Sequence, residues 1–98
     1  MSPVAVTFLP SASEEVEAAR LWYRRQSAAA VQGFRRELDH AVAMIAEGPE
    51  RHPPHLYGTR KFLLRRFPFM IVYRLDGGAV QVIAIAHTGR RPGYWRDR

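Results

Sequence analysis

The chain has 98 residues, of which 47% are hydrophobic, so it is long enough for a single domain over residues 1–98 with a modest core. It contains no cysteine, which excludes disulfides, thiol catalysis and cysteine-ligated zinc. No apolar run reaches the ~18–20 residues that span a bilayer, and residues 1–10 lack the basic flank of a signal peptide. We therefore expect a soluble cytoplasmic protein that has no membrane partner.

The formal net charge is +6, and it is unevenly distributed along the chain. Residues 1–50 carry five arginines and seven acidic side chains, whereas residues 51–98 carry ten basic and two acidic side chains. A basic half attracts anionic partners such as nucleic acid, a ribosome or an acidic protein. A solubilising surface would have the same charge, so charge alone does not select a function.

The N-terminal third predicts a strand followed by a helix. Residues 3–9 alternate between two faces, which is typical of a short strand, and Pro10 ends the pattern. Ser11 and Glu14 have the spacing of a capping box, so Ser11 is the expected N-cap of the first helix. At 3.6-residue spacing, the buried stripe of this helix consists of Ala12, Val16, Ala19 and Tyr23.

A second helix is expected over residues 28–47, with Ser27 as a candidate N-cap and Gly48 at its end. Because the connection between the two helices is short, they are predicted to form an antiparallel hairpin. The apolar stripe of the second helix consists of Val31, Phe34, Leu38, Ala41, Val42 and Ile45.

The C-terminal half predicts a loop and three strands. Residues 48–58 contain three prolines and two glycines, which is typical of a loop. Strands are expected over 60–67, 69–75 and 79–87, with a hairpin turn at residues 76–78. The last strand is apolar on both faces, which favours an interior place in the sheet. The predicted fold is α+β with the order β-α-α-β-β-β: a helical hairpin on one face of a mainly antiparallel four-stranded sheet.

The tail, residues 88–98, is rich in turn-forming residues and alternates cations with aromatic side chains. This pattern suits stacking on bases and contacts with phosphates. Alternatively, the two aromatic side chains fold back onto the core and fix the tail. The residues concerned are Arg90, Arg91, Tyr94, Trp95, Arg96 and Arg98.

A histidine pair in the loop is the one candidate for metal binding. His52 and His55 are three residues apart, which in polyproline geometry places them on one side. A metal site would need further ligands, and the sequence offers none that is evident. We therefore expect neither a metal nor a cofactor.

Three segments together carry a family resemblance: SASEEVEAARLWY at 11–23, RRFPFMIVYRLDGGAVQVIAIAH at 65–87 and RRPGYW at 90–95. In order and spacing they resemble the RelE/ParE toxins of type II toxin–antitoxin systems, particularly the ParE-like, plasmid-stabilisation branch. The resemblance covers nearly the whole chain, and the family's fold agrees with the predicted order of elements.

The resemblance implies a toxin that halts growth and a cognate antitoxin as its partner. An antitoxin of this family typically lays a helix in a groove near the helical hairpin or adds a strand to the sheet. An exposed apolar strip on the first helix is a candidate for this contact, although packing beneath the loop or sheet would also explain it. The candidate antitoxin-binding residues are Ala18, Leu21, Trp22 and Arg25. A homodimer and a heterotetramer with the antitoxin are both compatible with the sequence.

The family includes two activities: RelE-like members cut mRNA on the ribosome, and ParE-like members inhibit DNA gyrase. RNA cleavage by attack of a 2′-OH needs a base, cations that stabilise the phosphorane, and an acid for the leaving oxygen. If the chain is a nuclease, the catalytic candidates are His87, Arg65, Arg90 and Tyr94. His87 has an alternative role, which is to cap the sheet edge and hold the tail.

Met70 bears on the choice between the two activities. In RelE-like nucleases the strand after the Pro-aromatic break usually starts with an arginine that acts on the phosphate, and here that position is Met70. A thioether cannot neutralise phosphate charge, and losing such a cation typically costs ~3 kcal/mol of transition-state stabilisation. Met70 therefore favours the ParE-like activity, although Arg65 or Arg66 could substitute from the neighbouring strand.

Other cations are candidates for contact with the target. The strand arginines form either a cationic platform or a solvent-facing set, one of which pairs with the acidic first helix. The residues expected to contact the target or a nucleic acid are Arg66, Arg74, Arg91, Trp95 and Arg96.

Three functions follow, in order of preference. The first is a toxin that acts on DNA gyrase without being an enzyme and is neutralised by its antitoxin. The second is a ribosome-dependent, metal-independent mRNA endoribonuclease. The third is a basic binding module without toxicity.

Overall fold

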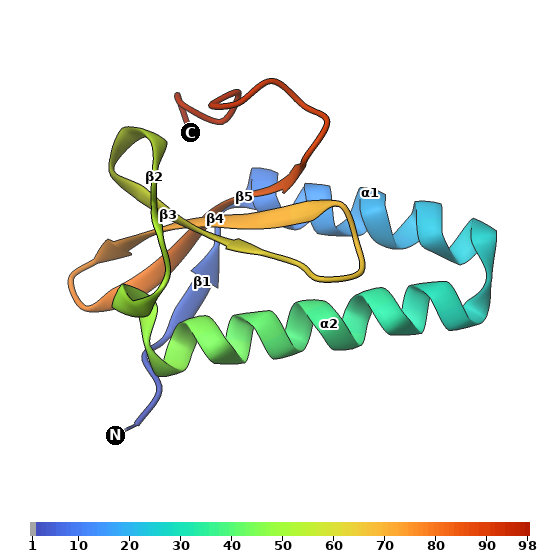
Figure 1. Cartoon of the computed structure of the whole chain (residues 1–98), viewed down its shortest axis with the longest axis horizontal. Coiled ribbons are helices and arrows are strands. Elements are labelled where there is room, and N and C mark those ends of the chain that lie inside the picture. The colour runs from blue at the N-terminus through green and yellow to red at the C-terminus, as the bar shows by residue number, and fades with distance from the viewer. Residues whose placement is uncertain (1) are drawn as a thin grey trace.

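Two antiparallel helices lie across one face of a five-stranded sheet in the computed structural model, which describes residues 2–98 (Figure 1). This arrangement confirms the predicted α+β fold with a helical hairpin. The elements are β1 (Val6–Phe8), α1 (Pro10–Gln26), α2 (Ala28–Glu47), β2 (Pro54–His55), β3 (Thr59–Leu63), β4 (Phe69–Asp76) and β5 (Ala79–His87), with 3-10 turns at Pro49–Arg51 and Leu56–Gly58.

The strands lie in the order β1-β5-β4-β3-β2. β1 pairs with β5 in parallel, and the other pairs are antiparallel, so the sheet is mixed and β5 has the interior place that its apolar faces predicted. The sheet has one strand more than expected because Pro54–His55, within the predicted loop, pairs with β3. A proline is tolerated there because β2 is an edge strand and its missing N–H faces no partner strand.

The helix boundaries confirm one predicted cap and correct another. The Ser27 hydroxyl accepts a hydrogen bond from the Ala30 N–H at 2.9 Å, as expected of an N-cap, and α2 spans the predicted residues 28–47. Ser11 is not the N-cap of α1: the helix begins at Pro10, and Leu9 takes the cap position without a side-chain bond. Proline suits the first helical position because its φ is already helical and it has no N–H to satisfy.

β3 ends at Leu63, four residues before the predicted end of the strand. The backbone N–H groups of Arg65 and Arg66 leave the sheet and donate hydrogen bonds to the Glu37 carboxylate on α2. A side chain of the helical hairpin therefore replaces the ladder partners that a longer strand would have supplied. This contact could not be predicted from the sequence, because the bonded residues are 28 and 29 positions apart.

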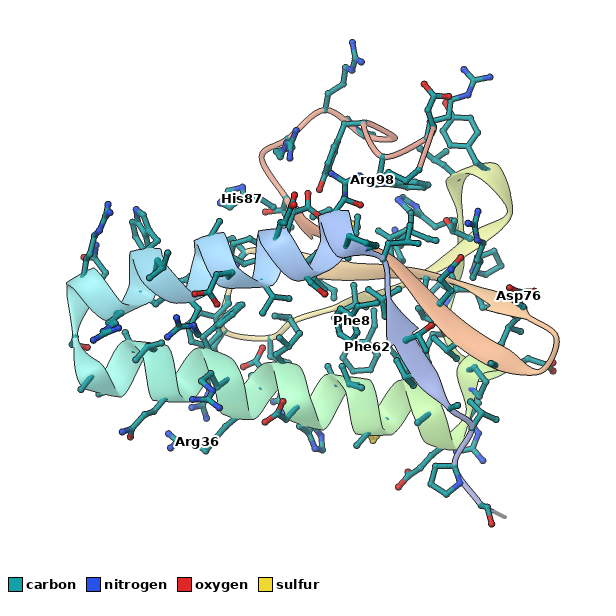
Figure 2. All side chains as sticks on the ribbon, turned by 180° about the vertical axis from the view of Figure 1, so that it is seen from behind. Phe8, Arg36, Phe62, Asp76, His87 and Arg98 are labelled. Carbon is teal, nitrogen blue, oxygen red and sulfur yellow. The ribbon has the colours of Figure 1, made fainter. Side chains whose placement is uncertain are left out.

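The sheet is covered on both faces. On the helical face, Tyr23, Phe34, Phe67 and Phe69 pack ring against ring with centroids 4.9 to 6.4 Å apart. Figure 2 shows Phe8 and Phe62 lying between the hairpin and the sheet. The opposite face is covered by the tail, residues 88–98, which turns back over the sheet toward the loop that carries β2 (Figure 1). The buried residues of this second cluster are Val72, Ile83, Ala84, Ala86 and Trp95.

The fold separates the charges into layers. The helical hairpin, residues 10–47, carries five arginines and six acidic side chains. The other ten basic side chains all belong to the sheet, its loops and the tail. Neither of the two helices in the described part of the chain has the length and apolar character needed to cross a membrane.

Candidate functional site

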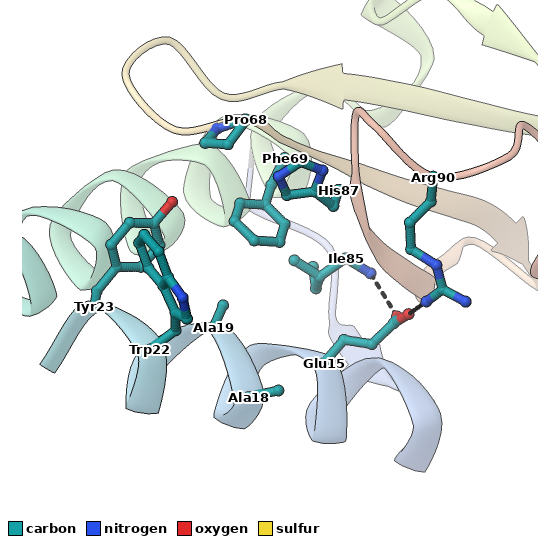
Figure 3. Close-up of a pocket in the computed structure, with 10 residues that line it drawn as sticks. All are labelled: Glu15, Ala18, Ala19, Trp22, Tyr23, Pro68, Phe69, Ile85, His87 and Arg90. Carbon is teal, nitrogen blue, oxygen red and sulfur yellow. Dashed lines mark hydrogen bonds and ion pairs between the residues drawn. The ribbon is translucent and has the colours of Figure 1, made fainter. Parts of the chain in front are cut away.

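An apolar groove of about 460 Å³ lies between α1 and the ends of β4 and β5 (Figure 3). One wall comes from α1 and the other from the start of β4, the end of β5 and the beginning of the tail. The lining residues are Glu15, Ala18, Ala19, Trp22, Tyr23, Pro68, Phe69, Ile85, His87 and Arg90. Such a groove, largely apolar with a few polar groups at one end, is the kind of surface that binds a partner side chain.

Helical spacing builds the first wall of the groove. Glu15, Ala18 and Trp22 are three and four residues apart, so they lie on one face of α1. The small side chain of Ala18 leaves room in the middle. Trp22 is 55% exposed, and its ring packs edge-on against the buried ring of Tyr23, with centroids 5.0 Å apart. A large indole that is held in place yet open to solvent is typical of a binding surface.

Strand register builds the second wall. Phe69 at the start of β4 pairs with His87 at the end of β5, and their rings lie 5.2 Å apart in an edge-to-face arrangement. Ile85 lies two residues before His87 and turns toward the same side of the sheet (Figure 3). The imidazole is exposed, and its Nδ1 accepts a hydrogen bond from the Gly89 N–H at 2.9 Å.

Glu15 is the polar centre at the end of the groove. Its carboxylate accepts hydrogen bonds from the Ile85 N–H at 3.0 Å, from Arg98 at 2.7 and 3.1 Å, and from the Tyr94 hydroxyl. Arg90 pairs with the same carboxylate at 3.4 Å. The side chain of Glu15 is only 15% exposed, so these partners offset the cost of removing its charge from water.

The same cluster changes the acidity of Tyr94. Burial, followed by the hydrogen bond to Glu15, raises the pKa of Tyr94 to about 12. The hydrogen bond to Glu15 also raises the pKa of Arg98. A phenol with such a pKa is a neutral donor near pH 7 and is poorly matched to proton transfer, which works best when the pKa lies near the operating pH.

The catalytic candidates are only partly brought together. His87, Arg90 and Tyr94 line a small hollow between the tail and the sheet, together with Met70. Arg65 lines neither this hollow nor the groove, and its backbone is bonded to Glu37 at the turn after β3. Arg90 stacks on the Tyr94 ring at 3.6 Å while it pairs with Glu15. Of the four residues named from the sequence, two are therefore engaged with the same carboxylate.

Four of the five residues expected to contact a target are exposed. Arg74 bonds to Gln81 on the neighbouring strand, and Arg96 lies over the Tyr57 ring at 4.9 Å. Arg66 and Arg91 are also exposed. Trp95 does not fit this expectation: it is 3% exposed and packs in the cluster on the sheet face that the helices leave free. The structure confirms the alternative prediction, in which the indole of Trp95 folds back onto the core and fixes the tail.

The candidate antitoxin-binding strip divides into two parts. Ala18 and Trp22 line the groove, whereas Leu21 and Arg25 are exposed elsewhere on α1. Glu15 was not predicted as a site residue. Its spacing from Ala18 and Trp22 could have placed it on the same helix face, but nothing in the sequence linked it to Ile85 or to the tail.

A helical hairpin packed on a mixed sheet, with an apolar groove beside the first helix, defines a small α+β protein. No group of three or more His, Asp or Glu side chains suited to a metal gathers within residues 2–98. The chain belongs to the ParE toxin family: a family model described as ParE toxin of type II toxin-antitoxin system, parDE, matches residues 6–92. It is thus a toxin of a type II toxin–antitoxin module, as the resemblance implied.

A solved structure described as the chromosomal ParDE TA system from P. aeruginosa has a similar fold. The TM-score is 0.69 at 20% sequence identity, and the match covers 86% of this chain and 95% of that chain. At this identity the similarity concerns the fold. Comparison with curated proteins gives no match.

Proposed function

We propose that the chain stops growth by inhibiting DNA gyrase in the cytoplasm, as a binding protein and not as an RNA-cleaving enzyme, and that a cognate antitoxin neutralises it. The observation that carries this proposal is the environment of Met70. Its side chain packs against the cluster of Val72, Ala86 and Trp95, on the sheet face covered by the tail. A thioether in an apolar cluster offers no charge to a phosphorane.

The groove is the proposed binding site for the antitoxin. Its walls are apolar, and Trp22 stands exposed at its rim. Arg90 and His87 also line it, and Arg90 pairs with Glu15, whose charge is paired with Arg98 as well. A segment with an apolar anchor followed by an acidic side chain fits this surface, because the anchor fills the groove and the acid meets Arg90. Docking of a helix or an extended segment would satisfy the same requirements.

The exposed arginines of the sheet, its turn and the tail form the surface proposed to contact the target. Arg66, Arg74, Arg91 and Arg96 are exposed on the sheet, its turn and the tail. A surface of this charge is attracted to acidic protein surfaces and to the DNA that gyrase holds, and its binding weakens as salt rises. Of the exposed tail arginines, Arg90 lines the groove, whereas Arg91 and Arg96 do not. An antitoxin in the groove therefore need not occupy the surface proposed for the target.

Purified toxin tests the proposal in a gyrase supercoiling assay. Inhibition at micromolar toxin, relieved by an equimolar amount of antitoxin, is the expected result. The control is the same assay with Trp22→Ala toxin, which should inhibit gyrase equally and need more antitoxin for relief. If micromolar toxin left supercoiling unchanged, gyrase would not be the target.

Ribosome-dependent mRNA cleavage is the second candidate, because His87, Arg90 and Tyr94 do line one hollow. It predicts cuts mapped within translated codons and a loss of toxicity in His87→Ala. Our proposal predicts no such cuts and full toxicity of His87→Ala. Expression of the two forms side by side, followed by mapping of mRNA ends, distinguishes these outcomes.

A further inference from the structure

The tail has no helix or strand, yet it is held firmly in place. Residues 88–98 form turns, with local bonds such as Arg96 N–H to the Gly93 carbonyl at 2.9 Å. Bonds of this kind shape a turn but do not attach it to the rest of the molecule. The attachment comes from one backbone bond, Thr88 N–H to the Pro68 carbonyl at 2.8 Å, from the burial of Trp95, and from side chains that reach α1 and β5.

Three side chains of the tail meet at one carboxylate. Tyr94, Arg98 and Arg90 come from three different turns of the tail, and each contacts Glu15. Arg90 and Arg98 also lie over the Tyr94 ring, at 3.6 and 5.2 Å. Two cations beside one phenol would repel each other without the carboxylate between them. The negative charge of Glu15 therefore allows Arg90, Arg98 and Tyr94 to lie next to one another.

The same contacts close a free strand edge. β1 ends opposite Val82, where the Leu9 N–H donates to the Val82 carbonyl at 2.9 Å. Beyond this point β5 continues to His87 without β1 beside it. The Ile85 N–H bonds to Glu15, and the Ile83 carbonyl accepts from Arg98 at 3.2 Å. Side chains thus supply the hydrogen bonds that a longer β1 would have made, on an edge that would otherwise be open to another strand.

We propose that Glu15 is a positioning residue that holds the tail as a strap over the free edge of β5, so that its loss releases the tail and exposes both that edge and Trp95. The consequence for function rests on the proposed role of Arg91 and Arg96 as target contacts. Both cations belong to the tail, so their placement depends on Glu15. Glu15 and Arg90 also line the groove, so a partner bound there would contact the residues that hold the tail in place.

The test is acrylamide quenching of Trp95 fluorescence in a Trp22→Phe background, which leaves Trp95 as the one tryptophan of the chain. Glu15→Ala is compared with Glu17→Ala, a matched control whose carboxylate pairs with Arg20 on the same helix. Loss of even one charge-assisted hydrogen bond corresponds to roughly a tenfold rise in the open population. Glu15→Ala should therefore increase the quenching of Trp95 and accelerate amide exchange across residues 88–98, while Glu17→Ala should match the parent protein.

A second variant keeps the test independent of any wider effect of Glu15→Ala on folding. Arg98→Gln together with Tyr94→Phe removes tail groups that contact Glu15 and leaves α1 unchanged. The amides of Ile71 and Val72, buried in β4, serve as internal references and should stay protected. Unchanged Trp95 quenching and tail exchange in this double variant would overturn the proposal, whatever Glu15→Ala does.

Gyrase inhibition by the same variants separates this inference from the proposed function. A released tail with unchanged inhibition would support the role of Glu15 and refute the tail arginines as target contacts. A tail that stays in place in the double variant refutes the role of Glu15, even if inhibition is lost.

Discussion

The backbone N–H of Ile85 donates a hydrogen bond to Glu15 at 3.0 Å, which joins the first helix to the last strand across 70 residues of sequence. This bond marks the end of the groove and the beginning of the region covered by the tail (Figure 3). The groove and the tail therefore have a residue in common, and substitutions on either side of Glu15 should have separable effects.

Trp22 is expected to dominate binding of the antitoxin. Its indole is 55% exposed at the groove and already held against Tyr23, so a partner gains contact area without having to order it. Trp22→Ala should weaken the complex by about 2 kcal/mol or more, roughly 30-fold in Kd. Leu21→Ala, on the neighbouring residue outside the groove, is the control and should change Kd by less than about threefold. Equal effects of the two substitutions, measured by titration calorimetry, would place the antitoxin elsewhere.

Tyr94 should make the protein less stable at alkaline pH. In the unfolded chain the phenol has a pKa of about 10, whereas in the fold the pKa is raised to about 12 by burial and by the bond to Glu15. The folded protein keeps this proton when the unfolded chain has lost it. The contribution of Tyr94 is therefore complete below about pH 10 and is lost as the pH rises toward about 12.

Urea unfolding at about pH 9 and about pH 11 measures this loss. The free energy of unfolding should fall more in the parent protein than in Tyr94→Phe, which has no proton to lose at this position. Burial also raises the pKa of Tyr23 and Tyr73, and both remain in the two proteins as a shared background. An identical fall in the two proteins would show that Tyr94 is not protected by the fold.

The two serines near the helix starts should differ in their effect on stability. Ser27→Ala removes the bond to the Ala30 N–H and should cost about 1 kcal/mol. Ser11→Ala should cost less than about 0.5 kcal/mol, because α1 begins at Pro10 and Ser11 caps nothing. Chemical denaturation of the two variants makes the comparison. A larger loss for Ser11→Ala would mean that the capping box read from the sequence does form.

Phe34 is expected to be essential to the helical face of the core. It is fully buried and packs against the rings of Tyr23, Phe67 and Phe69. Phe34→Ala should reduce the free energy of unfolding by about 3–5 kcal/mol, a large part of the stability of a domain this size. Arg36→Ala on the solvent side of the same helix should change it by less than about 0.5 kcal/mol (Figure 2). A small loss for Phe34→Ala would mean that the core refills the cavity.

The sequence was informative where the determinants of structure are local. The 3.6-residue stripe near 28–47 and the Ser27 cap predicted α2, and Asp76-Gly77-Gly78 predicted the hairpin between β4 and β5. The errors came from competing local signals or from long-range bonds. α1 begins at Pro10, so Ser11, the expected N-cap, lies inside the helix. The backbone N–H groups of Arg65 and Arg66 bond to Glu37 and not to a neighbouring strand, so β3 is shorter than predicted.

The site was less predictable than the fold. Trp22 and Ala18 could be predicted because, with Leu21, they form a second apolar strip beside the buried stripe of the same helix. Glu15 could not, because its partners lie 70 to 83 residues away and only the folded sheet brings them together. Both helices pack on one face of the sheet, so the apolar side chains of the other face need a different cover, and Trp95 provides part of it. The burial of Trp95 thus depends on the whole fold and could not be predicted from the tail alone.

The measurement that tests the central claim most directly is gyrase supercoiling with purified toxin, titrated with and without antitoxin and run beside a ribosome-dependent mRNA cleavage assay. The account predicts inhibited supercoiling that the antitoxin reverses, with mRNA left intact and His87→Ala as active as the parent protein. Intact supercoiling together with cleaved mRNA, lost in His87→Ala, would contradict it.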